Sequence, residues 1–316
     1  PDMKGGGEIS RFVRQIEAEG IHKINFQTIN SKKKISVKTT DYKKTDLVLN
    51  KLDQIFGQGI TASMLNLFLI DKKKFFERYV LEIRDDNVEE IAKANTLGNV
   101  VHDTIEQLYT PLLNKKLNVK ELKEIKKTVS KTVSKRIEKY INKKSLERGK
   151  NIIITNTAVN YVKKLIDKDI YSCSKGDKIT ILEVEKNFTN EIVRGKKTIR
   201  IRGKIDRIDL YNGKIRVVDY KTGKLIEKNK INIRFLKEIK NENGIYALQL
   251  LLYAIDVREN YKGEIYGEIV SSRDRINNKN ILEIEGERYL NDSLINQGEK
   301  YILEIIEEIK NADETF

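Results

Sequence analysis

Apolar residues recur at helical spacing through the first half of the chain. Positions three and four residues apart fall on one face of a helix, so this spacing predicts amphipathic helices. The predicted helices cover residues 10–19, 60–83, 95–113, 118–147 and 152–168. Ser63 is the N-cap candidate of the second helix, because its hydroxyl can accept a hydrogen bond from the first turn.

The spacing changes to a period of two from residue 178 onward. Alternation of apolar and polar residues predicts β-strands with one buried face. The predicted strands cover residues 178–188, 196–211, 214–222, 263–272 and 280–287. An apolar helix over 244–257 and a closing helix over 288–311 complete the chain. This order predicts a mixed β-sheet flanked by helices, an α/β (α+β) fold class.

The segment 202–224 contains the strongest turn signal of the chain. Asn212-Gly213 between alternating strands is typical of a two-residue type I′ hairpin turn, which also sets the register. In that register Asp206 faces Asp219, with Cβ atoms roughly 4.5–5.5 Å apart. Facing carboxylates destabilise a hairpin unless a cation lies between them, and oxygen ligands at this spacing suit Mg²⁺ or Mn²⁺. Lys221 follows on the same face, so the hairpin predicts a metal site with a lysine beside it.

Asp209 has the opposite strand parity from Asp206. We expect it to be structural and to pair with Arg216. An alternative interpretation makes the whole segment an exposed strand face, whose acids are balanced by Lys204, Arg207 and Arg216.

The net charge of the chain indicates what kind of partner it binds. The 316 residues include 61 Lys and Arg against 47 Asp and Glu, a formal net charge of +14. This excess favours a polyanionic partner, with nucleic acid first and a membrane surface second. A Lys-rich composition without such a partner is the alternative.

Several classes of protein are excluded or disfavoured by what the sequence lacks. Cys173 is the single cysteine, which excludes an intramolecular disulfide and a Cys-rich metal cluster. No apolar run reaches the length of about 18 residues that a membrane helix needs. The start has no signal-peptide core, so we expect a cytoplasmic protein without a membrane partner. No P-loop is present, which argues against an ATPase.

Four segments in a fixed order carry a family resemblance. They are "LGNVVHDTIEQLY" (97–109), "GKIDRID" (203–209), "DYKTG" (219–223) and "QLLLY" (249–253). Together they resemble the PD-(D/E)XK nuclease superfamily, in particular its RecB-like branch and the C-terminal nuclease domain of AddB-type helicase–exonuclease subunits. The resemblance implies a restriction-endonuclease-like core with an added helical region over residues 58–316. Residues 1–57 would form a connector resembling the tail of a helicase-like region.

The resemblance also implies roles for single residues. His102, Asp206, Asp219 and the carbonyl of Tyr220 would bind Mg²⁺ or Mn²⁺, and Asp206, Asp219 and Lys221 would be catalytic. The alternatives are a histidine satisfied in the core for His102 and an ordinary strand-end lysine for Lys221.

Other residues would support the site. Gln249 and Tyr253, four apart on one helix face, would contact DNA and support the active site; a buried Gln bonded to backbone is the alternative. Glu185 and Glu106 are candidates for acids behind the metal ligands, or plain surface acids. The basic helix over 118–147 would contact phosphates or be a solvated face.

The chain departs from the family pattern at the cysteines of an iron–sulfur cluster. Many relatives hold an iron–sulfur cluster that begins with a Cys-Pro pair, where this chain has Asp71-Lys72. We therefore expect no cluster, and a helix around residues 64–83 that docks by packing alone.

The expected function is that of a metal-dependent DNA nuclease, a hydrolase of phosphodiester bonds. It would act as an exonuclease module of a helicase–nuclease complex in DNA repair and recombination, with a helicase region or subunit missing from this chain. The alternatives are a stand-alone nuclease like those of CRISPR adaptation, and a non-catalytic DNA-binding or scaffolding module.

Overall fold

The computed structural model describes residues 10–22, 25, 42–83, 88–141, 150–195, 197–223, 231–240 and 244–316. The chain divides into two units, residues 1–40 and 41–316. The first unit contains helix α1 (Arg11–Glu19), which ends at Gly20 in the left-handed conformation with φ +64°. All other described elements belong to the second unit.

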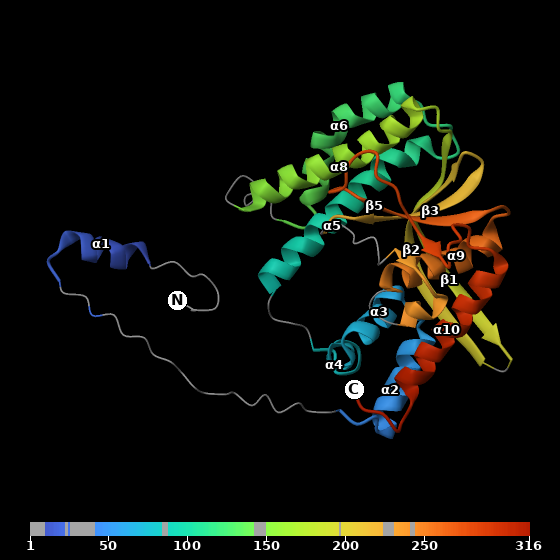
Figure 1. Ribbon diagram of the computed structural model, residues 1–316. Coiled ribbons are helices and arrows are strands. Elements are labelled where there is room, and N and C mark those ends of the chain that lie inside the picture. Colours follow the sequence, from blue (N-terminus) through green and yellow to red (C-terminus); the bar gives the residue numbers. More distant parts are fainter. Residues whose placement is uncertain are drawn as a thin grey trace. The chain divides into compact units, whose positions relative to one another are not determined.

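A mixed β-sheet forms the centre of the second unit (Figure 1). Its strand order is β1-β2-β3-β5-β6. The bounds are β1 Ile179–Arg194, β2 Lys197–Tyr211, β3 Lys214–Lys221, β5 Ile265–Ser271 and β6 Asn280–Ile281. All neighbours are antiparallel except β3 and β5, which are parallel because helix α9 crosses over between them. The predicted mixed sheet flanked by helices is thereby confirmed.

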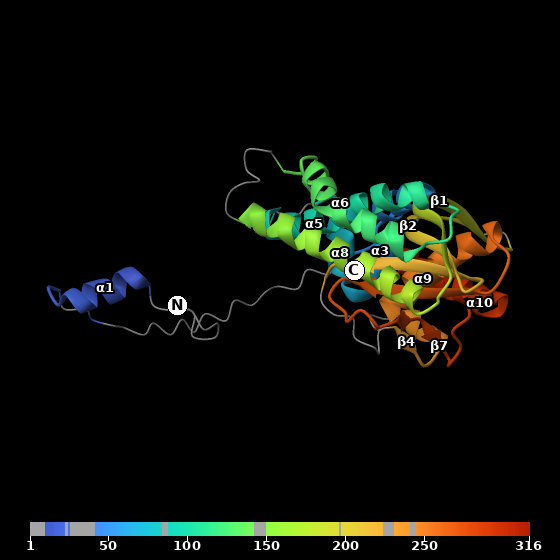
Figure 2. The same ribbon diagram turned by 90° about the horizontal axis from the view of Figure 1, so that it is seen from above.

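Helices cover both faces of this sheet (Figure 1). One face carries α5 (Val88–Tyr109), α6 (Val119–Ile137) and α8 (Lys150–Ser174). The other carries α2 (Asp46–Gly57), α3 (Ala62–Ile70), α9 (Ile245–Asn260) and α10 (Asp292–Lys310). Shorter elements are α4 (Lys72–Phe75), the π-helical turn η1 (Phe76–Val80), and the 3-10 turns η2 (Thr110–Leu112) and η4 (Leu236–Lys240). The strands β4 (Asn232–Ile233) and β7 (Glu283–Ile284), labelled in Figure 2, form a separate small parallel sheet.

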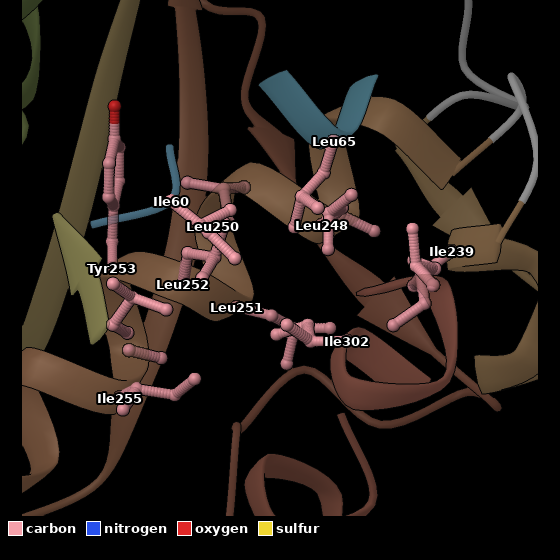
Figure 3. Close-up of a cluster of buried hydrophobic side chains, with 14 of the residues drawn as sticks. Ile60, Leu65, Ile239, Leu248, Leu250, Leu251, Leu252, Tyr253, Ile255 and Ile302 are labelled. Atoms are coloured by element: carbon pink, nitrogen blue, oxygen red, sulfur yellow. The ribbon is translucent and has the colours of Figure 1, made fainter. Parts of the chain in front are cut away.

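Strand parity divides the core into two clusters. On β3, Ile215 and Val217 pack toward α9, whereas Val218 and Tyr220 pack toward α5 and α8. Helix α9 is apolar nearly all round because it is buried between the sheet and α10. Its leucines lie between Ile60, Leu65 and Ile302 in Figure 3.

The predicted helix over 60–83 is interrupted. Thr61, and not Ser63, caps α3 by accepting a hydrogen bond from the Met64 amide. Asp71 then leaves the helical conformation (φ −154°, ψ 92°) and caps α4 through the Lys74 amide. A side chain that can cap a new helix competes with continuation of the old one.

This segment docks through apolar packing, as expected for a chain without the cluster cysteines. Met64, Leu65, Phe68, Phe75 and Phe76 are all buried in the core. The last three form ring contacts with one another or with the C-terminal Phe316.

Other expected boundaries shift. The long helix predicted over 118–147 ends at Ile137 as α6, and residues 142–149 lie outside the described part. The strand predicted over 280–287 is two short strands in different sheets, β6 and β7.

Helix α2 lies within the expected connector, yet it buries Leu52 and Phe56 in the same core. The boundary at residue 57 stays a prediction. Within the described ranges, no helix has the length and apolar character required to cross a membrane.

Candidate metal centre

The predicted metal ligands and Glu185 come from four elements. Strands β2 and β3 bring Asp206 and Asp219, β1 brings Glu185, and α5 brings His102. Helix α5 passes over the end of β3, where Gly98, one turn before His102, lies close to Thr222. The residues that resemble the family motifs thus converge, although more than 100 positions separate the first from the last.

His102, Glu185 and Asp206 form a compact group. One ligand atom from each lies within 4.8 Å of the others. The His102 Nδ1 atom is 2.8 Å from Glu185 Oε1 and 3.4 Å from Asp206 Oδ1. Both acids are buried, whereas the His102 side chain keeps 24% of its exposure. The group therefore reaches solvent on the histidine side.

Glu185 occupies this group because the backbone of β1 is distorted there. Its φ is +49°, a left-handed conformation that is uncommon for a non-glycine residue and costs of order 1–3 kcal/mol. The ladder with β2 pairs Val184 with Arg207 and Lys186 with Ile205, and omits the position between them. Glu185 also forms an ion pair with Lys204 at 2.9 Å. Backbone strain at this point is compensated by these two polar contacts.

The predicted hairpin register is confirmed as far as Arg207 and Val218, the last pair of the β2–β3 ladder. The predicted direct pair of Asp206 with Asp219 is wrong, since the ladder ends one position earlier. In its place the Tyr220 amide donates to Asp206 Oδ2 at 2.6 Å. Asp206 thus uses one carboxylate oxygen to hold β3 and turns the other toward His102.

Asp219 and Lys221 lie on the same face, as strand parity predicts. The Lys221 Nζ atom is 2.9 Å from Asp219 Oδ2 and donates to Gln249 Oε1 at 3.1 Å. Gln249 in turn donates to the Tyr253 hydroxyl at 2.7 Å. The predicted pair on α9 thus orients Lys221.

A glycine makes room for this support. A Cβ at Gly203 would lie 2.7 Å from the Phe188 ring, which packs edge-on against Tyr253. A larger residue at this point of β2 would displace Phe188, and with it Tyr253.

The electrostatics favour a cation. Burial and the neighbouring Asp219 carboxylate raise the pKa of Asp206 to about 7. Burial opposes the charged form of His102, but Asp206 and Glu185 outweigh it and raise its pKa to about 9. Burial likewise opposes the ammonium of Lys221, yet Asp219 and Asp206 raise its pKa. The protein without metal therefore attracts protons where a metal ion could bind.

The donor set fits a divalent ion. Two carboxylates and one imidazole suit Mg²⁺ or Mn²⁺, and Mn²⁺ accepts nitrogen more readily. In addition, the buried Asp219 Oδ2 has no hydrogen bond of adequate geometry within the described part of the chain, although Lys221 lies near it. A carboxylate oxygen has two lone pairs, so this atom can accept a cation in addition to the Lys221 ammonium.

The family model of the PD-(D/E)XK nuclease superfamily matches residues 60–315. The chain belongs to this superfamily. The matched range contains the predicted signature residues, Asp206 on β2 and Asp219-Tyr220-Lys221 on β3. PD-(D/E)XK nucleases use divalent metal ions, which agrees with the donor set described above.

Further comparisons add little. No curated protein matches the chain significantly. A solved structure described as "Crystal structure of SSO0001" is 13% identical, and the match covers 68% of this chain and 86% of that chain. Its TM-score of 0.26 supports no conclusion.

The two acids expected behind the metal ligands, or at the surface, have different positions in the structure. Glu185, expected behind the ligands, lies directly in the group with His102 and Asp206. Glu106 is half-buried and is not in this group. The hydrogen bond to Glu185 is the main reason why the pKa of Lys204 is raised, and the charge of Glu106 adds to this effect. Glu185 enters the group where the backbone of β1 is distorted, and strand alternation contains no signal for this distortion.

Proposed function

We propose that this PD-(D/E)XK protein is a metal-dependent deoxyribonuclease that hydrolyses phosphodiester bonds at the site described above. The observation that carries the proposal is the convergence of His102, Glu185 and Asp206 within 4.8 Å, next to the Asp219–Lys221 pair. His102, Asp206, Asp219 and the Tyr220 carbonyl would hold Mg²⁺ or Mn²⁺, with Glu185 as a further acid of the group.

When bound, the divalent ion would polarise the scissile phosphate and lower the pKa of a coordinated water. The side chains of the chain provide the remaining functions. Asp206 and Asp219 would place negative charge at the proposed ion site. Glu185 orients the imidazole of His102 through a hydrogen bond with the His102 Nδ1 atom.

Lys221 is the candidate for charge stabilisation and for orienting the attacking water. Its side chain is 30% exposed, so its ammonium group can contact a phosphate oxygen while it keeps its contacts to Asp219 and Gln249. A cation fixed in advance stabilises charge that develops on the phosphate, with little reorganisation during the reaction.

The direct test is digestion of end-labelled linear DNA with and without Mg²⁺. We expect cleavage only with the metal ion, and none by Asp219→Ala. Asp167→Asn is the matched control, since this acid pairs with Lys126 at the surface of α8, away from the site. Equal cleavage by Asp219→Ala, or cleavage in EDTA, would contradict the proposed site.

We further propose that the enzyme is an exonuclease module of a helicase–nuclease complex in DNA repair and recombination. This finer proposal is supported by the resemblance of its motifs to the RecB-like and AddB-type nuclease domains. The motor would lie elsewhere in the parent protein or on a partner subunit. Closed circular DNA should then resist cleavage, whereas linear DNA of the same sequence is degraded. Nicking of the circle at the linear rate would indicate an endonuclease.

A further inference from the structure

A row of buried charges lies on the α5–α8 face of the sheet, behind the candidate site. We call it the charge row; it consists of Asp169 on α8, Arg207 and Asp209 on β2, Arg216 on β3, and Glu268 on β5. Neighbouring members are joined by ion pairs of 2.6–2.8 Å. The row therefore crosses the central strands of the sheet and continues into a helix.

Asp169, at one end of the row, links this network to the helix of His102. Its Oδ2 atom accepts a hydrogen bond from the Tyr109 hydroxyl at 2.6 Å. Tyr109 is fully buried and lies on α5 about two turns after His102. The same oxygen accepts from Arg207 Nη1 at 2.7 Å, and Arg207 directly follows Asp206.

Arg207 extends the link to the third strand. Its Nη1 atom also donates to the Tyr220 hydroxyl at 3.3 Å. Tyr220 directly follows Asp219, and its amide holds the Asp206 carboxylate at 2.6 Å. One acid on α8 is thus connected, in at most two hydrogen bonds, to each of the three elements that carry His102, Asp206 and Asp219.

Stability alone does not account for such a network. Desolvation of buried ion pairs is costly, and apolar residues of similar volume are often as stable or more stable. Accurate placement is a stronger reason to keep the charges, because partners behind metal ligands commonly change metal affinity or activity by about 10–100-fold.

We propose that Asp169 is a positioning residue of the candidate metal centre. Through Tyr109 and Arg207 it fixes α5, β2 and β3 relative to one another, so that His102, Asp206 and Asp219 converge on one ion. This inference rests on the proposed function, and it concerns residues on the α5–α8 face of the sheet, whereas Asp219 and Lys221 lie on the α9 face.

The test compares two hydroxyl deletions in the full chain. Tyr109→Phe removes the hydrogen bond to Asp169 and retains the aromatic ring, which packs 5.4 Å from the Arg207 guanidinium. Tyr211→Phe is the matched control, because its hydroxyl also bonds to an aspartate, Asp177, but at the far end of β2 beside the turn. Asp169→Asn is the stronger variant, and it tests the whole link if it folds.

Four quantities are measured for each protein. Calorimetric titration with Mn²⁺, without DNA, gives the affinity for the ion. Single-turnover cleavage in Mn²⁺ gives the rate, and thermal unfolding in EDTA gives the stability. DNA affinity in Ca²⁺ serves as a check that the binding surface is intact.

We expect Asp169→Asn to weaken Mn²⁺ binding by roughly 10–100-fold. Tyr109→Phe should weaken it in the same direction by a smaller factor, with DNA affinity unchanged within about twofold. Tyr211→Phe should bind Mn²⁺ like the parent, even if its thermal midpoint falls as far as that of Tyr109→Phe.

Equal Mn²⁺ affinity of Tyr109→Phe, Tyr211→Phe and the parent would overturn the positioning role and leave the nuclease proposal intact. A parent chain that neither binds Mn²⁺ nor cleaves DNA would overturn the proposed function and this inference with it.

Discussion

Asp206 and Asp209 lie three residues apart on β2, and both are buried, yet their pKa values shift in opposite directions. Burial and Asp219 raise the pKa of Asp206 to about 7. Burial also opposes the charged form of Asp209, but the guanidinium groups of Arg207 and Arg216 outweigh it and lower the pKa.

The difference lies in the partners. Arginine remains protonated in proteins, so Asp209 has two permanent cations within 2.6–2.8 Å. Asp206 faces the imidazole of His102, which can exchange its proton for a metal ion, and a carboxylate neighbour that repels it. Burial of an acid therefore does not mark a functional site; a buried acid whose countercharge is exchangeable does.

A substitution of Asp206 is the most direct test of this contrast between Asp206 and Asp209. We expect Asp206→Asn to abolish Mg²⁺-dependent cleavage, because the amide is a poor ligand for the ion. Without metal at pH 8, its free energy of unfolding should not fall, since a buried carboxylate above its raised pKa is replaced by a neutral group. Urea unfolding in EDTA and single-turnover cleavage test both halves. A large loss of stability would mean that Asp206 is structural, like Asp209.

The converse change is at Asp209. Removing one partner of a buried ion pair commonly costs about 3–5 kcal/mol. Asp209→Ala should therefore lower the free energy of unfolding by this order, because it leaves Arg207 and Arg216 short of a countercharge. Urea unfolding measures the loss, with Glu124→Ala as the control, because Glu124 forms an exposed ion pair with Lys127 and its removal should change stability by about 1 kcal/mol or less. If Asp209→Ala were as stable as the parent protein, the structural role of Asp209 would be contradicted.

Lys221 provides a test of the catalytic role of the site that is separate from DNA binding. Lys221→Ala should reduce the single-turnover rate by about 10²–10³-fold, the usual cost of one group that acts on developing charge. DNA affinity in Ca²⁺ should change little, because many phosphate contacts on a chain of net charge +14 contribute to it. Fluorescence anisotropy beside cleavage separates the two. Cleavage within about threefold of the parent would exclude Lys221 from the reaction.

The smallest expected effect is stabilisation by the ion. At a Mn²⁺ concentration 100 times the dissociation constant, binding to the folded state alone adds about 2.7 kcal/mol. The thermal midpoint of the parent should rise with Mn²⁺, and that of Asp206→Asn should rise much less. An equal rise in both would place the ion outside this site.

The features of the site that depend on local geometry can be predicted from the sequence. Asn212-Gly213 sets the register that brings Arg207 opposite Val218, and parity places Lys221 beside Asp219. The contact between Gln249 and Tyr253 follows from helical spacing alone.

The sequence fails where tertiary contacts override local pattern. Alternation along β1 cannot predict the positive φ of Glu185, which depends on His102 and Lys204 from distant segments. The helix break at Asp71 is decided by a cap that competes with an otherwise continuous apolar stripe. The charge row was anticipated only in the pairing of Asp209 with Arg216, since Asp169 joins it from α8.

The parallel pairing of β3 with β5 also has a consequence during synthesis on the ribosome. About 30 residues separate Lys221 from Tyr253, which at 5–20 residues per second corresponds to roughly 2–6 seconds of translation. During this interval the nascent chain has its acidic strands but not α9, which orients Lys221, nor β5, which borders β3. We therefore expect the proposed active site to stay incomplete until α9 and β5 have been translated, while the chain is still close to the polyanionic RNA of the ribosome.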